Sequence, residues 1–474
     1  MQQLSGQDAS FLYFETPKSP MHIGSFLVYD PSSASGSFVR FKDVLAHVES
    51  RLHLSRVFRQ RLVHVPFNLD HPYWIEDDAF DLEFHVRHIA LPKPGDWRQL
   101  CIQAARLHSR PMDLTRPLWE MYVIEGLDNV EGAPPGSFAI LTKTHHAIID
   151  GASGAEILSY LHDLEADPPN KPVAQPWKGE SEPAAIELIM RTHFNNLTQP
   201  TRFFETMARS MPGMMKLSAG LSSQKLKPVG VVPRTRFNGK ITGHRVTDGR
   251  SFAIADVKAI KDAVKSATIN DAVLALIGGA LRRYLDAKQE LPKDSMIAMA
   301  PVSVRGSEQG GSAGNQVSGM LVALGTHIGD PLERLKVVHE AAMNSKAMTA
   351  AIGARTMTDY SQFIPSSVAA LAARMYTEMG LSDYTTPMMN CVVTNVPGPQ
   401  RPLFFAGAQA VKMVGLGPIY DGMALIHPVF SYCGEIAVSF TSCREVLPDP
   451  GFYSECIQAS FEELRDAARL VTES

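Results

Sequence analysis

Segments with the pattern of β-strands alternate with segments of helical periodicity in both parts of the chain, and a polar, proline-rich stretch separates the two series. Because 474 residues exceed what one hydrophobic core usually serves, we expect two α/β halves, each with a mixed sheet and flanking helices. The sequence divides into residues 1–166 for the first half, 167–243 for a connecting region with helices, and 244–474 for the second half.

The expected elements follow from the spacing of apolar residues, which is two in strands and three or four in helices. In the first half we expect strands near 21–29, 84–91, 120–125 and 137–145, and helices near 41–52, 98–109 and 155–164. In the second half we expect helices near 257–264 and 270–285, and strands near 296–302, 317–324, 389–396, 408–416 and 435–442. Residues 184–226 have helical spacing, and we expect Pro200 and Pro212 to interrupt them.

The charge balance and the cysteines exclude several classes of protein. A net charge of -4 and a pI near 6.5 do not fit a globally basic nucleic-acid-binding protein. The 5 cysteines form no paired motif, which favours free thiols in a reducing cytoplasm over a zinc site or a disulfide framework. The first residues lack the pattern of a signal peptide, and no apolar run reaches the roughly 18 residues of a spanning helix, so we expect any contact with lipid to come from the surface.

The sharpest chemical signal is the run His-His-Ala-Ile-Ile-Asp-Gly at residues 145–151, where an expected strand ends and a loop begins. An imidazole with a pKa near neutrality can take a proton from an alcohol, and the alkoxide can then attack a thioester. Asp150 follows too closely to reach the outward face of the same ring, so we expect it to hold the loop, while Gly151 permits a tight turn. The alternative is a pair of partly buried histidines with structural roles only.

No nucleophile elbow of the G-x-S-x-G type lies beside the histidines, which favours direct transfer over an acyl-enzyme intermediate. Several further blocks accompany the histidine motif in order along nearly the whole chain. They are residues 8–15 and 20–24, His71-Pro72-Tyr73-Trp74, Phe80-Asp81-Leu82, Arg116-Pro117-Leu118-Trp119-Glu120, Pro233-Arg234-Thr235 with Asn238-Gly239, residues 268–275, Pro301-Val302-Ser303-Val304-Arg305, Gly314-Asn315-Gln316 and Thr394-Asn395-Val396-Pro397-Gly398-Pro399.

Together these blocks resemble the bacterial wax ester synthase/diacylglycerol acyltransferase family, part of the CoA-dependent acyltransferase superfamily that includes chloramphenicol acetyltransferase and condensation domains. The resemblance implies two chloramphenicol-acetyltransferase-like halves that form a tunnel open to acyl-CoA from one face and to the alcohol from the other. It also implies that His146 is the general base, His145 a supporting residue, and Asp150 a structural residue paired with an arginine, for which we expect Arg305.

Other residues in the matching blocks have less direct roles. Asn270, at the start of an apolar helix, is either an N-cap or a donor near the oxyanion or the acceptor hydroxyl. The segment 117–119 and Trp74 are expected to pack, and Glu15 and His22 are expected to fix the first strand. Asn395 with the following Pro-Gly-Pro is expected to form a rigid turn that lines the acceptor channel.

The activity implied by the resemblance is transfer of a long-chain acyl group from acyl-CoA to a hydroxyl. Diacylglycerol as acceptor gives triacylglycerol, and a long-chain alcohol gives a wax ester. Acyl-CoA is a substrate, and neither a metal nor a cofactor is expected. The alternatives are a carrier-protein-dependent condensation-type acyltransferase and a non-catalytic lipid-binding protein that keeps the fold. The preferred acceptor, the acyl length, the substrate-binding residues and the oligomeric state stay open.

Residues 203–215, rich in Met and Phe, have two interpretations. They cover the junction of the two halves, or their apolar face rests on a lipid surface while Arg202, Arg209 and Lys216 meet anionic headgroups. The second interpretation is favoured. It predicts a cytoplasmic protein that is peripheral on the inner face of the cell membrane or on lipid inclusions.

Overall fold

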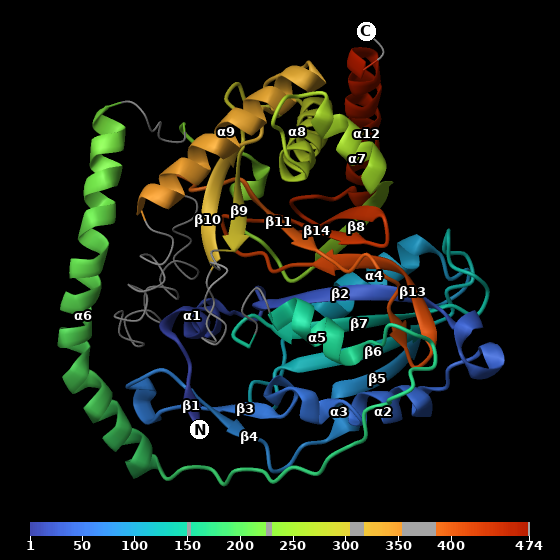
Figure 1. Cartoon of the computed structure of the whole chain (residues 1–474), viewed down its shortest axis with the longest axis vertical. Coiled ribbons are helices and arrows are strands. Elements are labelled where there is room, and N and C mark those ends of the chain that lie inside the picture. Colours follow the sequence, from blue (N-terminus) through green and yellow to red (C-terminus); the bar gives the residue numbers. More distant parts are fainter. Residues whose placement is uncertain (149–152, 224–229, 304–316, 353–384, 473–474) are drawn as a thin grey trace.

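Two six-stranded sheets and a small three-stranded sheet form the frame of the molecule (Figure 1). The computed structural model describes residues 1–148, 153–223, 230–303, 317–352 and 385–472. Asp150 and Arg305, the predicted ion pair, lie outside the described residues. The mixed sheets with flanking helices agree with the α/β fold expected from the sequence.

The first sheet carries the histidine motif at the end of one of its central strands. Its order is β12-β13-β2-β7-β6-β5, and only β5 and β6 pair in parallel. The strands are β12 (Phe404–Phe405), β13 (Ala408–Leu416), β2 (His22–Asp30), β7 (Phe138–His145), β6 (Trp119–Glu125) and β5 (Val86–Ala90). The strand expected at 84–91 therefore begins later, after the one-turn helix α3 (Leu82–His85).

Alternation along β6 and β7 divides the first half into two cores. Met121 and Ile140 face a core completed by α2 (Phe41–Glu49) and α5 (Ser153–Leu161). The neighbouring residues of the same strands face the opposite core, which α4 (Trp97–His108) completes. A third, smaller cluster joins α1 (Gly6–Phe14) to the end of the histidine strand.

The three-stranded sheet lies beside the first half and has the order β1-β4-β3. Its strands are β1 (Gln2–Gln3), β4 (Tyr73–Glu76) and β3 (Gln60–Val63).

The second sheet has the order β10-β9-β11-β14-β15-β8. Its strands are β10 (Val317–Ala323), β9 (Ile297–Ser303), β11 (Cys391–Pro397), β14 (Leu425–Tyr432), β15 (Glu435–Cys443) and β8 (Arg245–Ala253). Four helices cover the face of this sheet that points away from the first half (Figure 1). They are α7 (Ile254–Asp262), α8 (Ile269–Ala287), α9 (Pro331–Ile352) and α12 (Pro450–Thr472).

A segment from the second half of the sequence completes the sheet of the first half. Strand β13 has the bounds expected at 408–416, but it pairs with β2 of the first sheet rather than with a strand of the second. Sheet membership therefore does not follow the linear order of the chain at this point, and the first sheet is completed by residues from beyond position 400.

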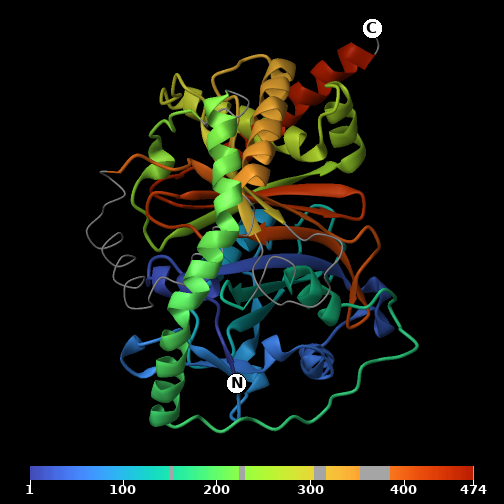
Figure 2. The same cartoon turned by 60° about the vertical axis from the view of Figure 1, so that its left-hand side comes forward.

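A single long helix, α6 (Ala185–Ser222), runs along one side of both halves (Figure 2). The expected interruptions at Pro200 and Pro212 are wrong, because the helix continues through both positions. An internal proline costs about 3 kcal/mol, which packing along a long helix can offset. Here Leu188 is buried against the small sheet and the helix also contacts α9. Among the residues that the structure describes, no helix has the length and apolarity needed to traverse a bilayer.

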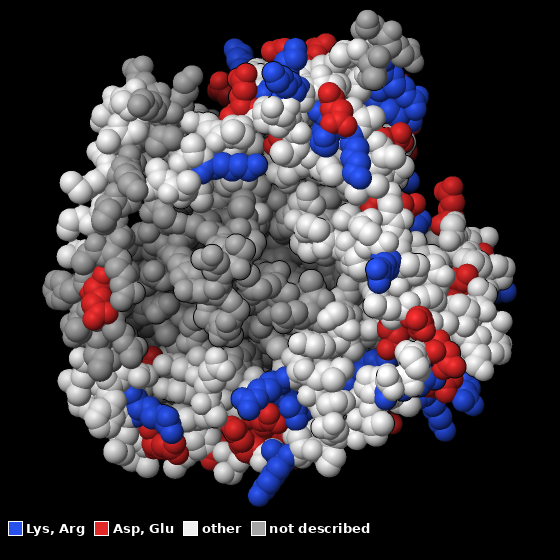
Figure 3. All heavy atoms as spheres, in the orientation of Figure 1, with Lys and Arg blue, Asp and Glu red and all other residues white. Residues whose placement is uncertain are grey.

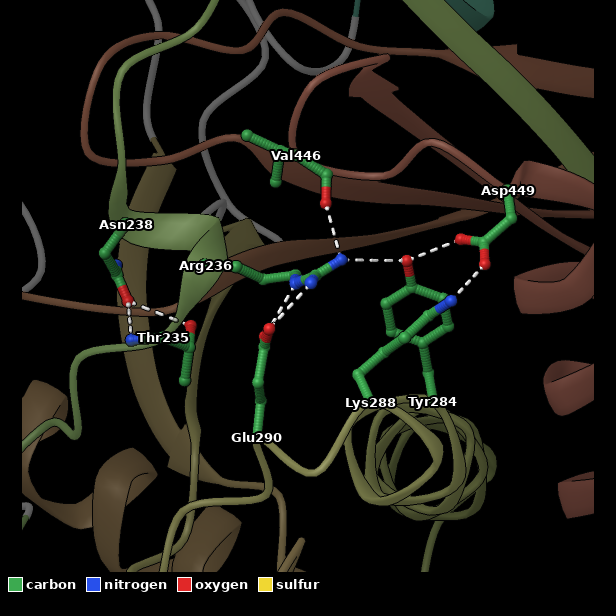
Figure 4. Close-up of polar contacts among 8 residues, drawn as sticks. All are labelled: Thr235, Arg236, Asn238, Tyr284, Lys288, Glu290, Val446 and Asp449. Atoms are coloured by element: carbon green, nitrogen blue, oxygen red, sulfur yellow. Dashed lines mark hydrogen bonds and ion pairs between the residues drawn. The ribbon is translucent and has the colours of Figure 1, made fainter.

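The segment before β8 is fixed to the second half by a group that we call the Arg236 clamp, formed by Arg236, Tyr284, Lys288, Glu290 and Asp449 (Figure 4). The guanidinium of Arg236 donates to both carboxylate oxygens of Glu290 at 2.7 Å and to the Tyr284 hydroxyl at 3.2 Å. That hydroxyl donates to Asp449 at 2.6 Å, and Lys288 pairs with the same carboxylate. The clamp ties the connecting segment to α8 and to the start of α12.

Candidate active site

The end of β7 holds the histidine pair on a rigid backbone. His145 pairs with His22 across the sheet, and its N–H donates to the carbonyl of Leu118 at 3.0 Å. The N–H of His146 donates to the carbonyl of Met21 at 2.9 Å. Because both amides are held by neighbouring segments, the two rings start from fixed positions.

Both ring nitrogens of His145 are used within the protein. Its Nδ1 accepts the N–H of Ala147 at 3.1 Å, so its Nε2 carries the proton and donates to Oε2 of Glu15, also at 3.1 Å. The side chain of His145 is fully buried. This arrangement is compatible with the supporting role that the family resemblance implies for His145.

Glu15 is a site residue whose link to the histidines the sequence did not reveal. It was expected only to fix the first strand, and its Oε1 indeed accepts the N–H of Met21 at 3.4 Å. Its other oxygen holds His145, which lies 130 residues away in sequence. Glu15 follows the last residue of α1, whose N-terminus is capped by Ser5. Helix α1 therefore delivers the carboxylate to the histidine.

The ring of His146 is the one available for proton transfer. It stacks on Phe11 of α1, with the centroids 3.9 Å apart and the planes at 12°. Burial, the largest cause, lowers the pKa of His146 to about 4; its own backbone carbonyl opposes this shift, and the charge of His145 adds to it. Nδ1 is buried without a hydrogen-bond partner, and Nε2 makes no hydrogen bond with the described residues either. At neutral pH His146 is thus an uncharged imidazole able to accept a proton.

Buried polar groups support the histidine strand on the face of His145. Lys143, fully buried, donates to Glu120 at 3.1 Å and to the carbonyl of Arg110 at 2.9 Å. His22 donates through Nε2 to the carbonyl of His108 at 2.5 Å, and burial lowers the pKa of both imidazoles. Buried charges persist in proteins when they are paired and hydrogen-bonded, as here. Polar residues at the end of an apolar strand are a sequence signal that could have indicated this layer, but no role was expected for Lys143 or Glu120.

The opposite face of β7 is apolar apart from two threonines. Thr142 and Thr144 line a narrow cavity between β6, β7 and α5. Its apolar lining comes from Val57, Phe58, Trp119, Met121, Ile157 and Leu161. Leu118 and Trp119 are buried, which confirms the packing role expected for segment 117–119.

The N-cap role considered for Asn270 is wrong. Thr268 is the N-cap of α8, and it forms a capping box with Asp271, whose carboxylate also accepts from Nδ1 of His339 at 2.9 Å. Asn270 lies inside the first turn, where its Oδ1 accepts from Nδ2 of Asn395 at 3.4 Å. The amide nitrogen of Asn270 makes no hydrogen bond within the described parts of the chain, so it is available as a donor.

Asn395 also differs from its predicted setting. It was expected in a rigid turn, but it lies within β11, which pairs in parallel with β14 and extends to Pro397. The extended backbone holds its side chain at the first turn of α8. Among the described residues, no group of three or more His, Cys, Asp or Glu side chains is arranged to hold a metal ion.

Comparison with known proteins places these residues in context. The model of the wax ester synthase/diacylglycerol acyltransferase catalytic domain matches residues 4–273, and the model of the WS/DGAT C-terminal domain matches residues 313–465. A Mycobacterium tuberculosis protein named as a diacylglycerol O-acyltransferase is 33% identical over 472 residues, which is 99% of this chain and 91% of the relative.

Two solved structures are similar over almost the whole chain. The wax ester synthase/diacylglycerol acyltransferase from Marinobacter aquaeolei VT8 matches with a TM-score of 0.69 and 26% identity, covering 99% of this chain and 100% of that one. The first condensation domain of the CDA synthetase matches with a TM-score of 0.57 and 14% identity, covering 99% of this chain and 96% of that one. The second similarity concerns the fold alone.

Proposed function

The chain belongs to the wax ester synthase/diacylglycerol acyltransferase family, and from this premise we propose that it transfers a long-chain acyl group from acyl-CoA to the hydroxyl of diacylglycerol or of a long-chain alcohol. The products are triacylglycerol and wax ester. The observation that supports the proposal is the uncharged ring of His146, whose Nε2 makes no hydrogen bond with the described residues, beside a His145 whose two nitrogens are already engaged.

In the proposed reaction, Nε2 of His146 accepts the proton of the acceptor hydroxyl while its oxygen attacks the thioester carbonyl carbon. The tetrahedral intermediate collapses, the carbon–sulfur bond breaks, and the imidazolium returns its proton to the CoA thiolate. Every proton is accounted for by one imidazole, so the step needs neither a metal nor a prosthetic group. The side-chain Nδ2 of Asn270, which makes no hydrogen bond with the described residues, is the donor that we assign to the oxyanion or the acceptor hydroxyl.

His145 and Asp150 are assigned supporting work. The hydrogen bond from His145 to Glu15 fixes the strand end from which His146 projects. Asp150 is assigned to hold the loop that follows, with Arg305 as its proposed partner.

The carrier-protein-dependent alternative is less favoured, because the likeness to condensation domains is limited to the fold at 14% identity.

Long-chain substrates reside in membranes and lipid droplets, and helix α6 offers a surface for meeting them. Its exposed large apolar side chains are between 40% and 69% exposed; they are Ile186, Met190, Phe194, Leu197, Met207, Met211 and Met215. At about 100° per residue they fall within an arc of roughly 140°. Figure 3 shows few charged side chains along the described part of this edge. We assign this stripe to contact with lipid on the cytoplasmic face of the membrane or on lipid inclusions.

A matched pair of variants tests the lipid contact. Met190→Lys with Met215→Lys places two charges on the stripe, whereas Met343→Lys with Met388→Lys changes two methionines of similar exposure elsewhere. On vesicles of phosphatidylcholine with diacylglycerol, the first pair should reduce the bound fraction at least about ten-fold, because two side chains that would be buried in the lipid become charged. Equal binding by both pairs of variants would show that the exposed apolar side chains of α6 do not make the lipid contact.

The activity itself is tested with purified protein and palmitoyl-CoA, offered hexadecanol and diacylglycerol in parallel. Release of CoA together with a new ester supports the proposal, and the ratio of the two products gives the acceptor preference. Release of CoA only with a carrier-bound thioester favours the condensation-type alternative. Lipid binding without any ester leaves a non-catalytic lipid-binding protein.

A further inference from the structure

Residues 16–21 form a short bridge between β2 and helix α1, and one side of this bridge holds the histidine pair. Met21 supplies the carbonyl that accepts the N–H of His146 at 2.9 Å. The N–H of Met21 in turn donates to Glu15, whose other oxygen accepts from His145 at 3.1 Å. A turn closed by reciprocal backbone hydrogen bonds between Thr16 and Ser19 makes the bridge compact.

The other side of the bridge is held by the second half of the molecule. The ammonium of Lys18 pairs with Oδ2 of Asp421 at 2.7 Å, and the guanidinium of Arg245 donates to the carbonyl of Lys18 at 2.6 Å. The hydroxyl of Ser19 donates to the carbonyl of Ile419 at 2.8 Å. Lys18 and Ser19 thus receive three contacts from residues more than 200 positions away in sequence.

The part of the second half that makes these contacts is itself fixed. The N–H of Ile241 donates to the remaining oxygen of Asp421 at 2.8 Å, and Gly422 exchanges hydrogen bonds with the segment 238–239. The preceding Arg236 clamp ties this segment to α8 and α12 (Figure 4). Asp421, only 1% exposed, is therefore a charge on a rigid support rather than on a free loop.

We propose that the second half positions the catalytic histidine through this bridge, with the ion pair between Lys18 and Asp421 as the tie that sets its place. Lys18 and Asp421 act as positioning residues and touch no substrate. The inference rests on the proposed function of His146. It adds that the base of the first half is productive only while the second half holds residues 16–21.

The physical reason lies in the burial of Asp421. When Lys18 loses its charge, the buried carboxylate keeps the N–H of Ile241 but has no cation, and such a group draws in water or another donor. The bridge can then shift by a fraction of an ångström while the cores of both halves stay intact. A misplacement of about 1 Å can cost about a hundred-fold in rate, so a smaller shift is expected to cost about ten-fold.

The test compares Lys18→Met, Lys18→Arg and Lys171→Met in the full chain. Lys171 is the control, because its ammonium pairs with Asp167 at 2.7 Å, the same distance, on the surface of the connecting region. Ester formation from palmitoyl-CoA and hexadecanol is measured for kcat and for each KM. Lys18→Met should lower kcat about ten-fold with each KM within about two-fold, Lys18→Arg should recover most of the loss, and Lys171→Met should match the wild type.

Asp421→Asn completes the test as a double-mutant cycle with Lys18→Met. If the two residues act as one tie, the double variant loses no more kcat than the worse single variant. The proposal would be overturned if the losses of kcat in the two single variants multiply in the double variant. It would also be overturned if Lys18→Met leaves kcat unchanged, or if Lys18→Arg does not recover the loss.

A readout independent of turnover separates this proposal from the proposed function. The rate at which diethyl pyrocarbonate modifies His146 is followed by peptide mass spectrometry. Release of the bridge should change that rate at least about three-fold in Lys18→Met and leave it unchanged in Lys171→Met. If the wild type makes no ester but this rate changes as expected, the tie stands and the proposed reaction falls. If the wild type makes ester and the rate does not change, the tie falls.

Discussion

Glu15 offers the most quantitative prediction about the histidine pair. Glu15→Ala removes the acceptor of the Nε2–H of His145, whose side chain is fully buried, and so leaves a buried donor without a partner. An unsatisfied buried donor costs about 1–3 kcal/mol, and the bond replaced here has a charged acceptor, so we expect a loss of about 2 kcal/mol in the free energy of unfolding. Glu15→Gln keeps an oxygen acceptor and should cost less than about 1 kcal/mol.

The assay can be limited to the first half, because 3 of the 4 tryptophans lie in it and the fourth, Trp177 of the connecting region, packs against its core. Urea unfolding followed by tryptophan fluorescence therefore reports on the half that contains Glu15. The rate of ester formation should fall about ten-fold in Glu15→Ala and by less in Glu15→Gln. The reason is that Glu15 holds His145, which fixes the end of the strand from which His146 projects. If both variants unfold within about 0.5 kcal/mol of the wild type, the argument from the buried donor is refuted.

Three further predictions concern protons and the first turn of α8. The pKa of about 4 at His146 predicts that the acid limb of kcat/KM, measured in short assays, lies near pH 4, and a midpoint between 6 and 7 would contradict it. Burial lowers the pKa to about 3 or about 4 at His47, His108, His162 and His427 as well, so these rings stay neutral in the folded state and take up protons on unfolding below pH 6.5. The free energy of unfolding should hence fall as the pH drops from 6.5 toward 4, by up to about 1.4 kcal/mol per pH unit for each histidine. Above pH 7 it should not change with pH on account of these histidines. A fall above pH 7 with none below 6.5 would contradict the lowered pKa values. Asn270→Ala should lower kcat about a hundred-fold without loss of stability, whereas Thr268→Ala should cost about 1 kcal/mol of stability as the loss of a cap; the opposite pattern would return Asn270 to a structural role.

Strong periodicity made most elements of both halves predictable. The strand expected at 408–416 has the bounds of β13, and the helix expected at 270–285 lies within α8. The pairing of β13 with β2 was not predictable, because nothing in a strand's own pattern says which sheet receives it.

Elements without a clear pattern were missed. Strand β14 contains Pro428 although it lies between β11 and β15, and a proline argues against a central strand. The ladder between β14 and β15 skips residues 427 and 428, which shows how the sheet accommodates it. At α6 the same reasoning predicted breaks that packing against both halves prevents.

The site was predictable as far as local spacing carries information. The histidine motif indicated that a base could lie where a strand ends, and the choice of His146 as that base came from the resemblance to the family. The bond from His145 to Glu15, the buried Lys143 with Glu120, and the contact of Lys18 with Asp421 join distant segments. A single sequence holds no record of such pairs, so they emerge only when the chain is folded.

The most direct test of the central claim is the rate of ester formation by His146→Ala, measured with palmitoyl-CoA and both acceptors. Loss of a general base typically costs about a hundred- to ten-thousand-fold, so we predict a fall of at least about a hundred-fold with an unchanged urea unfolding curve. A rate within about three-fold of the wild type, from a variant that folds normally, would contradict the assignment of His146 as the base.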